Sequence, residues 1–240
     1  MEYSSISNIG KVRHDNQDYY GSVKKGKNRF FIVADGMGGY KGGEIASKLA
    51  VNSFLRFIEE NDSDNLYNLQ EDALSYSNTK VYEESKKNEE YSLMGTTVVC
   101  VCIDVDKNLL HFSHIGDSRA YLFRDNTLKQ ITRDHSLVND LLDSGSLTPE
   151  EAKNYKNKNT ITRAVGSESK IKIDSISFEM QKNDIILLVT DGLTDEVGEK
   201  EIIEIVSKNK SSEEISSNLV DLAIENGGHD NITITTILMR

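Results

Sequence analysis

The sequence predicts a single α+β domain built on antiparallel strands, and three observations support that prediction. A chain of 240 residues is long enough for one well-buried domain. In its middle, short β-branched runs follow one another with only brief polar turns such as Asp106-Lys107-Asn108 between them. Helical periodicity is confined to separate blocks on either side. Parallel strands would need long crossover connections, so a doubly wound parallel sheet is disfavoured.

The first hundred residues read as three strands followed by two helices. Alternation or β-branched composition predicts strands at residues 3–9, 19–23 and 29–34. The period then becomes helical, because Ile45, Leu49 and Phe54 share one face and no proline or glycine interrupts them. We expect amphipathic helices at 43–60 and after the capping residues 62–64.

The rest of the chain is mostly strands, followed by two more helices. An antiparallel meander is expected from the runs at 96–105, 109–115, 119–124 and 128–132. Further strands are expected at 175–179 and 184–190, helices at 199–207 and 212–226, and a half-buried strand, alternating isoleucine with threonine, at 231–239.

A polar, low-aromatic segment from Ser136 to Val165 interrupts this pattern. Within it, Thr148-Pro149-Glu150-Glu151 has the threonine cap, early proline and third-position glutamate of a helix start. Residues 154–159 are rich in asparagine and lysine, and we expect a loose loop there. We interpret the segment at about 136–165 as a small flap inserted into a single domain spanning residues 1–240.

Composition limits the partners and the compartment. The formal net charge of −11 argues against a nucleic-acid backbone or an anionic membrane as the main partner, and it suits cation binding or simple solubility. No run approaches the roughly 18 to 20 apolar residues that span a bilayer, and the first residues lack the features of a signal peptide. We therefore expect a cytoplasmic monomer with no direct membrane insertion.

The two cysteines, Cys100 and Cys102, are expected to be buried, reduced thiols. They lie two residues apart in a strand, and alternation places both side chains on one face. Neighbours in one strand do not form an ordinary disulfide, and a metal site would need further soft ligands.

The stretch Val33-Ala34-Asp35-Gly36-Met37-Gly38-Gly39 ends a hydrophobic run in a carboxylate and a glycine cluster. A charged Asp35 at the end of a buried strand is costly unless a partner neutralises it. The glycines let the backbone turn and bring a carbonyl close to a ligand. Asp35 and the Gly36 carbonyl thus offer adjacent oxygen ligands to a hard divalent cation. The alternative is a turn with a surface aspartate.

The same pattern of an aspartate beside glycine recurs along the chain. It is found at Asp35-Gly36, Gly116-Asp117, Asp191-Gly192 and Gly228-His229-Asp230, and Asp18 closes a polar run nearer the start. Each could be a turn residue, but each also borders an apolar run, so it would emerge at the rim of the core. If those rims coincide, several carboxylates share one cleft and require two or more hard cations to remain ionised.

These residues resemble the motif series of the metal-dependent serine/threonine protein phosphatases, the PPM or type-2C family. The motifs occur in family order over nearly the whole chain: Arg13 with Asn16 and Asp18, Val33 to Gly39, Gly95-Thr96-Thr97, Ile115 to Arg119, Thr190-Asp191-Gly192, and Gly228 to Thr233. The length and the Asp-Gly-Met-Gly-Gly form of the second motif resemble bacterial single-domain members. The resemblance implies a four-layer α-β-β-α sandwich, with two antiparallel β-sheets flanked by helices and metals at one end.

The resemblance also implies roles for individual residues. Asp35 would bridge two Mn²⁺ or Mg²⁺ ions, the Gly36 carbonyl would bind one, and Asp191 and Asp230 would complete the other. Asp18 would act through a water molecule, and Asp117 with Asp191 would hold a third, weaker ion. Arg13 matches the phosphate-binding arginine, whose planar fork suits two phosphate oxygens. The alternative for Arg13 is a surface ion pair with Asp15 or Asp18.

The implied reaction is hydrolysis of phosphoserine or phosphothreonine in proteins by a metal-activated water, without a covalent intermediate. Eukaryotic members have a histidine, assigned as general acid, where this chain has Met37, which cannot donate a proton. None of the five histidines has a motif-based claim to that role; His111 and His114 lie in a strand and are expected to be structural. A water on a third ion is the hypothesis we favour.

Substrates and partners follow only from the resemblance. It implies phosphorylated proteins, with a cognate membrane serine/threonine kinase and its targets as the usual partners. Substrate choice is expected to depend on the flap, Ser136 to Val165. Two alternatives stay open: a catalytically silent interaction module on the same fold, and a hydrolase of nucleotides or other small phosphate esters.

Overall fold

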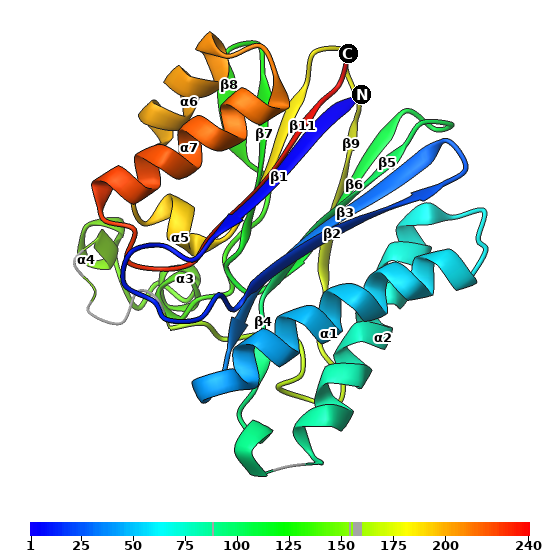
Figure 1. Ribbon diagram of the computed structural model, residues 1–240, viewed down its shortest axis with the longest axis vertical. Coiled ribbons are helices and arrows are strands. Elements are labelled where there is room, and N and C mark those ends of the chain that lie inside the picture. Colours follow the sequence, from blue (N-terminus) through cyan, green and yellow to red (C-terminus); the bar gives the residue numbers. More distant parts are fainter. Residues whose placement is uncertain (88, 154, 156–159) are drawn as a thin grey trace.

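The computed structural model describes residues 1–87, 89–153, 155 and 160–240. It is a four-layer sandwich in which two antiparallel sheets pack face to face and helices cover both outer faces (Figure 1). This arrangement confirms the fold class expected from the sequence.

The strands divide between two sheets. The first sheet has the order β1 (Glu2–Asn8), β11 (Ile232–Leu238), β10 (Ile185–Val189), β7 (Arg119–Arg124) and β8 (Thr127–Gln130). The second has the order β2 (Asp18–Lys25), β3 (Asn28–Met37), β5 (Val98–Asp104), β6 (Leu109–Ile115) and β9 (Asp174–Glu179), and the short β4 (Gly95–Thr96) extends the pairing of β3. The paired strands described here are antiparallel throughout.

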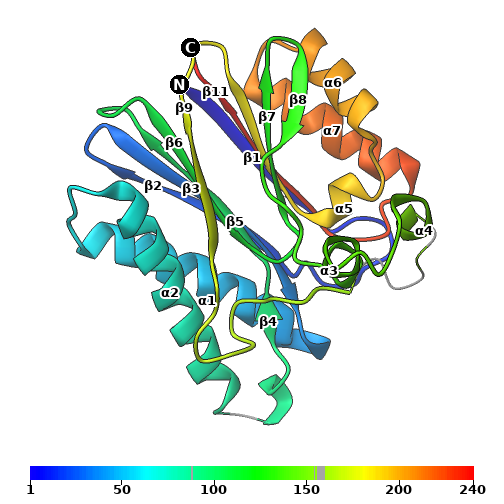
Figure 2. The same cartoon turned by 180° about the vertical axis from the view of Figure 1, so that it is seen from behind.

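The helices lie in three groups (Figure 2). The second sheet is covered by α1 (Gly39–Glu60) and α2 (Leu66–Ser85), with a 3-10 turn at Glu89–Tyr91. The first sheet is covered by α6 (Glu199–Lys208) and α7 (Ser212–Asn226), which follow the single-turn α5 (Asp191–Thr194). The flap contributes α3 (Leu137–Asp143) and α4 (Pro149–Lys153). None of the helices in the described ranges is both long and apolar enough to cross a bilayer.

Three clusters of buried side chains fill the interfaces between the four layers. The unbroken apolar run of strand β3 contributes side chains to two of these clusters, because successive side chains point to opposite faces of the sheet. Phe31 and Val33 pack between the sheets, whereas Phe30 and Ile32 pack against α1 and α2. Cys100 and Cys102 lie together in the helix-facing cluster as free, buried thiols, as predicted.

The predicted meander through the middle of the chain is wrong at its centre, although β5 pairs with β6 and β7 pairs with β8 as expected. Strands β6 and β7 follow each other in sequence but belong to different sheets, and β9 and β10 separate in the same way. Between β6 and β7 the chain changes sheet at residues 116–118, where Gly116 adopts a left-handed φ of 99°. A short connection between two strands predicts proximity but does not decide whether they pair, so the crossing was not visible in the sequence.

The turn expected directly after Asp35 comes later. Strand β3 continues to Met37 because β4 pairs with Gly36 and Met37, and the chain turns at Gly38, where φ is 121°. Helix α1 then begins at Gly39 rather than at residue 43. A Cβ atom on Gly43 would sit 2.6 Å from the Gly36 carbonyl oxygen, so glycine is required for the helix to pack this closely on the strand.

Strand β11 is fully buried, not half-buried as the alternation predicted. It lies between β1 and β10, and α7 covers its outer face. Its threonines find partners inside the protein: the Thr235 hydroxyl bonds that of Ser5 and the Thr236 hydroxyl accepts from Ser216, each at 2.8 Å. Because their hydroxyls are hydrogen-bonded, the threonines of this strand can be buried along with its isoleucines, on both faces of the sheet.

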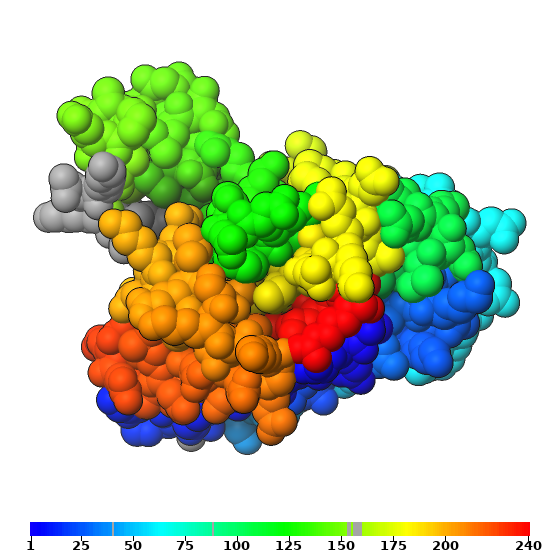
Figure 3. Space-filling view, turned by 90° about the horizontal axis from the view of Figure 1, so that it is seen from above, coloured from blue at the N-terminus to red at the C-terminus, as the bar shows by residue number. Residues whose placement is uncertain are grey.

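The flap, which contains α3 and α4, projects from the body of the sandwich (Figure 3). Its predicted capping box is present, because Thr148 Oγ1 accepts the Glu151 N–H and Glu151 accepts the Thr148 N–H. The bridge Ser136–Ile161 joins the two ends of the flap to each other, and the bridge Thr96–Val165 joins the flap to the body. Of the loop expected at 154–159, only residue 155 is described, so that prediction falls outside the described structure.

Asn78 of α2 holds the segment that leaves the flap. It is 1 % exposed, its Nδ2 donates to the Glu168 carbonyl at 2.9 Å, and its Oδ1 accepts the Gly166 N–H at 2.8 Å. Asn78→Ala is expected to lower the free energy of unfolding by about 2–3 kcal/mol in chemical denaturation, because buried backbone groups lose their partners. Thr79→Ala, on the exposed face of the same helix, should change it by less than about 0.5 kcal/mol. Equal effects of the two substitutions would contradict this role.

Candidate metal centre

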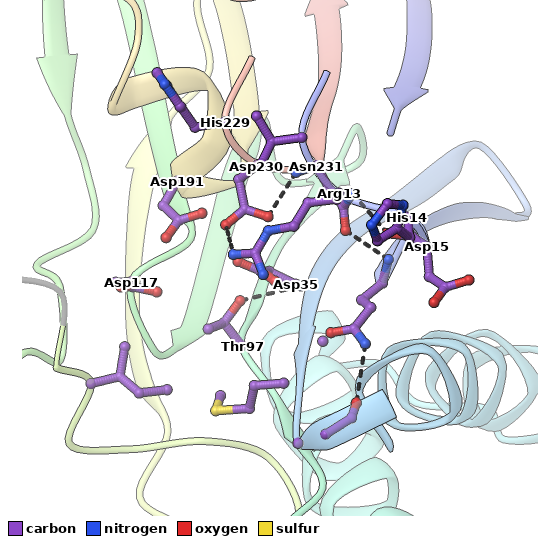
Figure 4. Close-up of a pocket in the computed structure, with 17 residues that line it drawn as sticks. Arg13, His14, Asp15, Asp35, Thr97, Asp117, Asp191, His229, Asp230 and Asn231 are labelled. Atoms are coloured by element: carbon purple, nitrogen blue, oxygen red, sulfur yellow. Dashed lines mark hydrogen bonds and ion pairs between the residues drawn. The ribbon is translucent and has the colours of Figure 1, made fainter. Parts of the chain in front are cut away.

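Five aspartates from separate parts of the sequence meet at one end of the sandwich. Four of them, Asp35, Asp117, Asp191 and Asp230, line a cavity of about 920 Å³ and point toward one another (Figure 4). They come from the end of β3, the β6–β7 crossing, the start of α5 and the loop before β11. Because β1 starts opposite the end of β11, both chain termini lie at the other end of the sheets.

Asp18 lies behind this cavity rather than in its wall. It is 5 % exposed and is the direct cross-strand partner of Asp35. Its Oδ2 accepts a hydrogen bond from the Thr190 hydroxyl at 2.9 Å. The structure thus brings Asp18 next to the other four carboxylates.

The cluster is electrostatically strained. Burial, followed by repulsion from Asp18 and the other carboxylates, raises the pKa of Asp35 well above its usual range. Burial is also the main reason that the pKa rises to about 7 for Asp18, to about 7 for Asp117 and to about 6 for Asp191. The neighbouring carboxylates add to each of these shifts. Positive charge in the cavity would relieve the repulsion.

The donor set fits a hard divalent cation. Asp18 Oδ1 and Asp191 Oδ1 are buried and have no hydrogen-bond partner among the described residues, and the Gly36 backbone also lines the cavity. Carboxylate and carbonyl oxygens are the ligands that Mg²⁺ and Mn²⁺ prefer. Within the described ranges, no three acidic, histidine or cysteine side chains are arranged to hold one ion by themselves. An ion here would complete its shell with carbonyl and water oxygens.

Arg13 reaches across the mouth of the cavity. Its Nη2 lies 2.6 Å from Asp230 Oδ2, so the ion pair that it forms is with neither Asp15 nor Asp18, the alternatives considered from the sequence. The hydrogen bond to Asp230 raises the pKa of the guanidinium. About half of the side chain stays exposed, so the fork is open to an anion entering the cavity.

Asn231 fixes the loop that carries Arg13, a role that the sequence did not reveal. Its Nδ2 donates to the carbonyls of Ile9 and Asp15 at 2.9 and 3.0 Å, and its Oδ1 accepts the Gln17 N–H at 2.8 Å. The sequence placed Asn231 in a motif, but only the fold brings residues 9–17 beside it. Asp230 and Asn231 thus act on the same loop, one through charge and the other through backbone hydrogen bonds.

The histidines differ in their placement relative to the cavity. His14 and His229 line the cavity, but His229 turns its ring away from the carboxylates, and its Nδ1 lies 2.6 Å from Glu196 Oε1. His111 and His114 bond Ser177 and the Arg133 carbonyl, as expected for structural residues. Met37 also lines the cavity.

Comparison with known proteins identifies the family. Residues 11–221 match the family described as Protein phosphatase 2C. The chain belongs to this family. It is 37 % identical to protein phosphatase PhpP of Streptococcus pneumoniae, over 100 % of this chain and 98 % of that protein.

Solved structures of similar phosphatases share the fold. Serine/threonine phosphatase Stp1 from Staphylococcus aureus has a TM-score of 0.92 and 31 % identity, covering 100 % of this chain and 95 % of that one. The catalytic domain of serine threonine protein phosphatase PstP, solved in complex with two manganese ions, has a TM-score of 0.85 and 32 % identity, covering 98 % and 96 %. These similarities agree with the four-layer fold described above.

Proposed function

We propose that this phosphatase hydrolyses phosphoserine and phosphothreonine esters in proteins, with divalent cations held by the five clustered aspartates. Membership of the protein phosphatase 2C family and similarity to named serine/threonine phosphatases support the reaction class. The observation that carries the residue assignment is the meeting of Asp35, Asp117, Asp191 and Asp230 in one cavity, with Asp18 behind them. The raised pKa values of Asp18, Asp35, Asp117 and Asp191 indicate a site that requires cations.

The proposed ligands follow the geometry. Asp35 would bridge two Mn²⁺ or Mg²⁺ ions, the Gly36 carbonyl would bind one of them, and Asp191 and Asp230 would hold the other. Asp18 would act through a water molecule, because it lies behind the cavity wall. When bound, the two ions would activate water as a nucleophile and neutralise charge on the phosphate. The structure of PstP in complex with two manganese ions supports Mn²⁺ as the ion.

Arg13 is proposed to bind two equatorial phosphate oxygens and to orient the ester in the cavity. To do so it would exchange its contact with Asp230 for the phosphate, which frees that carboxylate for a cation. The planar fork matches the phosphate geometry better than an ammonium group does. The chain's own contribution to the reaction is therefore positioning and charge, with no covalent phosphoenzyme.

Replacing Arg13 tests this role. Arg13→Ala is expected to lower kcat/KM for a phosphothreonine peptide by roughly 100-fold, since charge-assisted hydrogen bonds to phosphate contribute about 1.5–3 kcal/mol. Arg13→Lys should recover only part of the loss. Arg56→Ala, which removes an exposed ion pair with Glu60, is the control and should leave turnover unchanged. Turnover by Arg13→Ala equal to that of the control would refute the assignment.

A third, weaker ion is proposed between Asp117 and Asp191. Met37 has no proton to give the leaving alkoxide, so the proton must come from elsewhere in the cavity. We favour a third ion, which when bound would supply a water molecule as the proton donor. Asp117→Ala is expected to slow phosphopeptide turnover by at least about 10-fold at saturating Mn²⁺ while binding of the first two ions persists. Unchanged turnover by Asp117→Ala at saturating Mn²⁺ would rule the third ion out.

The substrates proposed are phosphorylated proteins, among them a cognate membrane serine/threonine kinase and its targets. We propose further that residues 1–240 form one catalytic domain, monomeric and cytoplasmic, and that the flap at 136–165 selects substrates by contacting residues around the phosphate. Ile161, in the segment of the flap that returns to the body, lines the cavity and supports that role.

One assay separates this proposal from the two alternatives. Hydrolysis of a phosphothreonine peptide, a nucleotide and p-nitrophenyl phosphate is measured as Mn²⁺ is titrated, and a chelator is then added. The proposal predicts Mn²⁺-dependent, chelator-reversible hydrolysis that favours the peptide. Faster turnover of the nucleotide would indicate a small-ester hydrolase. Absence of hydrolysis of all three would indicate a silent module.

A further inference from the structure

Thr97 lies between two of the proposed metal-binding segments. It is 2 % exposed and follows β4, beside the end of β3. Its N–H donates to the Asp35 carbonyl at 2.8 Å, and its Oγ1 accepts the Asp35 N–H at 3.3 Å. Thr97 therefore holds both backbone polar groups of Asp35.

The other side of Thr97 contacts the residues before and after Asp117. Its Oγ1 lies 2.6 Å from Ser118 Oγ, and Ser118 is 1 % exposed. A Cβ atom on Gly116 would sit 2.6 Å from Thr97 Cβ and Cγ2, so the turn packs directly on the threonine methyl side. One side chain thus joins Asp35 to the turn that carries Asp117.

A bridge of this kind is needed because the two carboxylates belong to different parts of the fold. Asp35 is fixed by the ladder of the second sheet, whereas Asp117 lies where the chain crosses between the sheets. His135 also binds the turn, since its N–H donates to the Gly116 carbonyl and its Nδ1 accepts the Gly116 N–H. That contact ties the turn to the flap but does not fix it relative to Asp35.

We infer that Thr97 and Ser118 are positioning residues, whose hydroxyl pair fixes Asp117 relative to Asp35 and so sets the affinity of the third cation site. The inference rests on the metal centre proposed above. Residues that orient metal ligands typically change the affinity of the ion when they are replaced, without touching it themselves. The pair should therefore affect the Asp117-dependent ion and leave the first two ions in place.

The test is a binding titration rather than an activity assay alone. Mn²⁺ is added to metal-free protein, and free Mn²⁺ is followed by its electron paramagnetic resonance signal, for the wild type, Ser118→Ala, Thr97→Ser, Thr97→Val and Asp117→Asn. We expect Ser118→Ala to weaken the site that Asp117→Asn removes by roughly 10-fold, with the first two ions bound within about twofold of the wild type. Thr97→Ser, which keeps the hydroxyl, should bind Mn²⁺ like the wild type, and Thr97→Val should not.

Controls distinguish positioning from a general loss of structure. Ser113→Ala removes another buried hydroxyl from β6 away from the cavity, and it should leave the titration unchanged. Adding Ser118→Ala to Asp117→Asn should have no further effect on Mn²⁺ binding. The inference is overturned if Ser118→Ala titrates like the wild type, if Thr97→Ser is as weak as Thr97→Val, or if the wild type has no Asp117-dependent site. Failure of the wild type to hydrolyse phosphopeptides would instead refute the proposed function, and the titrations would still decide this inference.

Discussion

Asp35→Asn is expected to abolish phosphopeptide hydrolysis and, at the same time, to make the metal-free protein more stable. Loss of the proposed bridging ligand should remove several kcal/mol of transition-state stabilisation, which corresponds to at least about 10³-fold in kcat. The metal-free protein should melt at a higher temperature because a buried carboxyl group with a strongly raised pKa is replaced by a neutral amide.

Opposite changes in activity and stability distinguish a ligand from a structural residue. Thermal melts of both proteins in chelator and in Mn²⁺ measure the second effect, and Mn²⁺ should stabilise Asp35→Asn far less than the wild type. Asp106→Asn, in an exposed ion pair with Lys27, is the matched control and should change neither property appreciably. A variant of Asp35 that keeps Mn²⁺-dependent turnover within tenfold of the wild type would show that the bridge is assigned to the wrong residue.

Removal of the metal is expected to destabilise the protein most at neutral and alkaline pH. The carboxyl groups of Asp18 and Asp117 have a pKa of about 7 in the folded chain and an ordinary value of 3.8. Below about pH 4 these groups are protonated in both the folded and the unfolded chain, so they do not change the free energy of unfolding with pH. Between about pH 4 and pH 7 the unfolded chain releases the protons first, so the free energy of unfolding falls as the pH rises, and it levels off above about pH 7.

Saturating Mn²⁺ should offset this decline. A ligand at about 100 times its Kd adds about 2.7 kcal/mol, which is roughly 5–10 °C for a domain of this size. Melting curves from pH 5 to pH 8 should therefore diverge between chelator and Mn²⁺ as the pH rises, with Asp18→Asn flattening the curve in chelator. Curves that stay parallel across this range would show that burial and mutual repulsion do not raise the pKa of these aspartates in the folded protein.

Local structure was largely readable from the sequence. The strands at Leu109–Ile115 and Arg119–Arg124 and the helix at Ser212–Asn226 have the bounds expected from periodicity alone. Errors arose where a neighbour distant in sequence decides the outcome. Strand β3 runs past Asp35 because β4 pairs with it, and β11 is buried on both faces because β1, β10 and α7 surround it.

The sequence by itself determined which residues can bind a cation, because the identity of an oxygen ligand is a property of each residue and the motifs carry it. That Asp35, Asp117, Asp191 and Asp230 line one cavity was decided only by the tertiary structure, since each comes from a different strand end or crossing. The contacts that surround the cavity, from Asn231 to the Arg13 loop and from Thr97 to Ser118, join residues that no periodicity relates. The chemistry of a side chain is a property of that residue alone. The proximity of residues that are far apart in the chain is set only when the two sheets pack together.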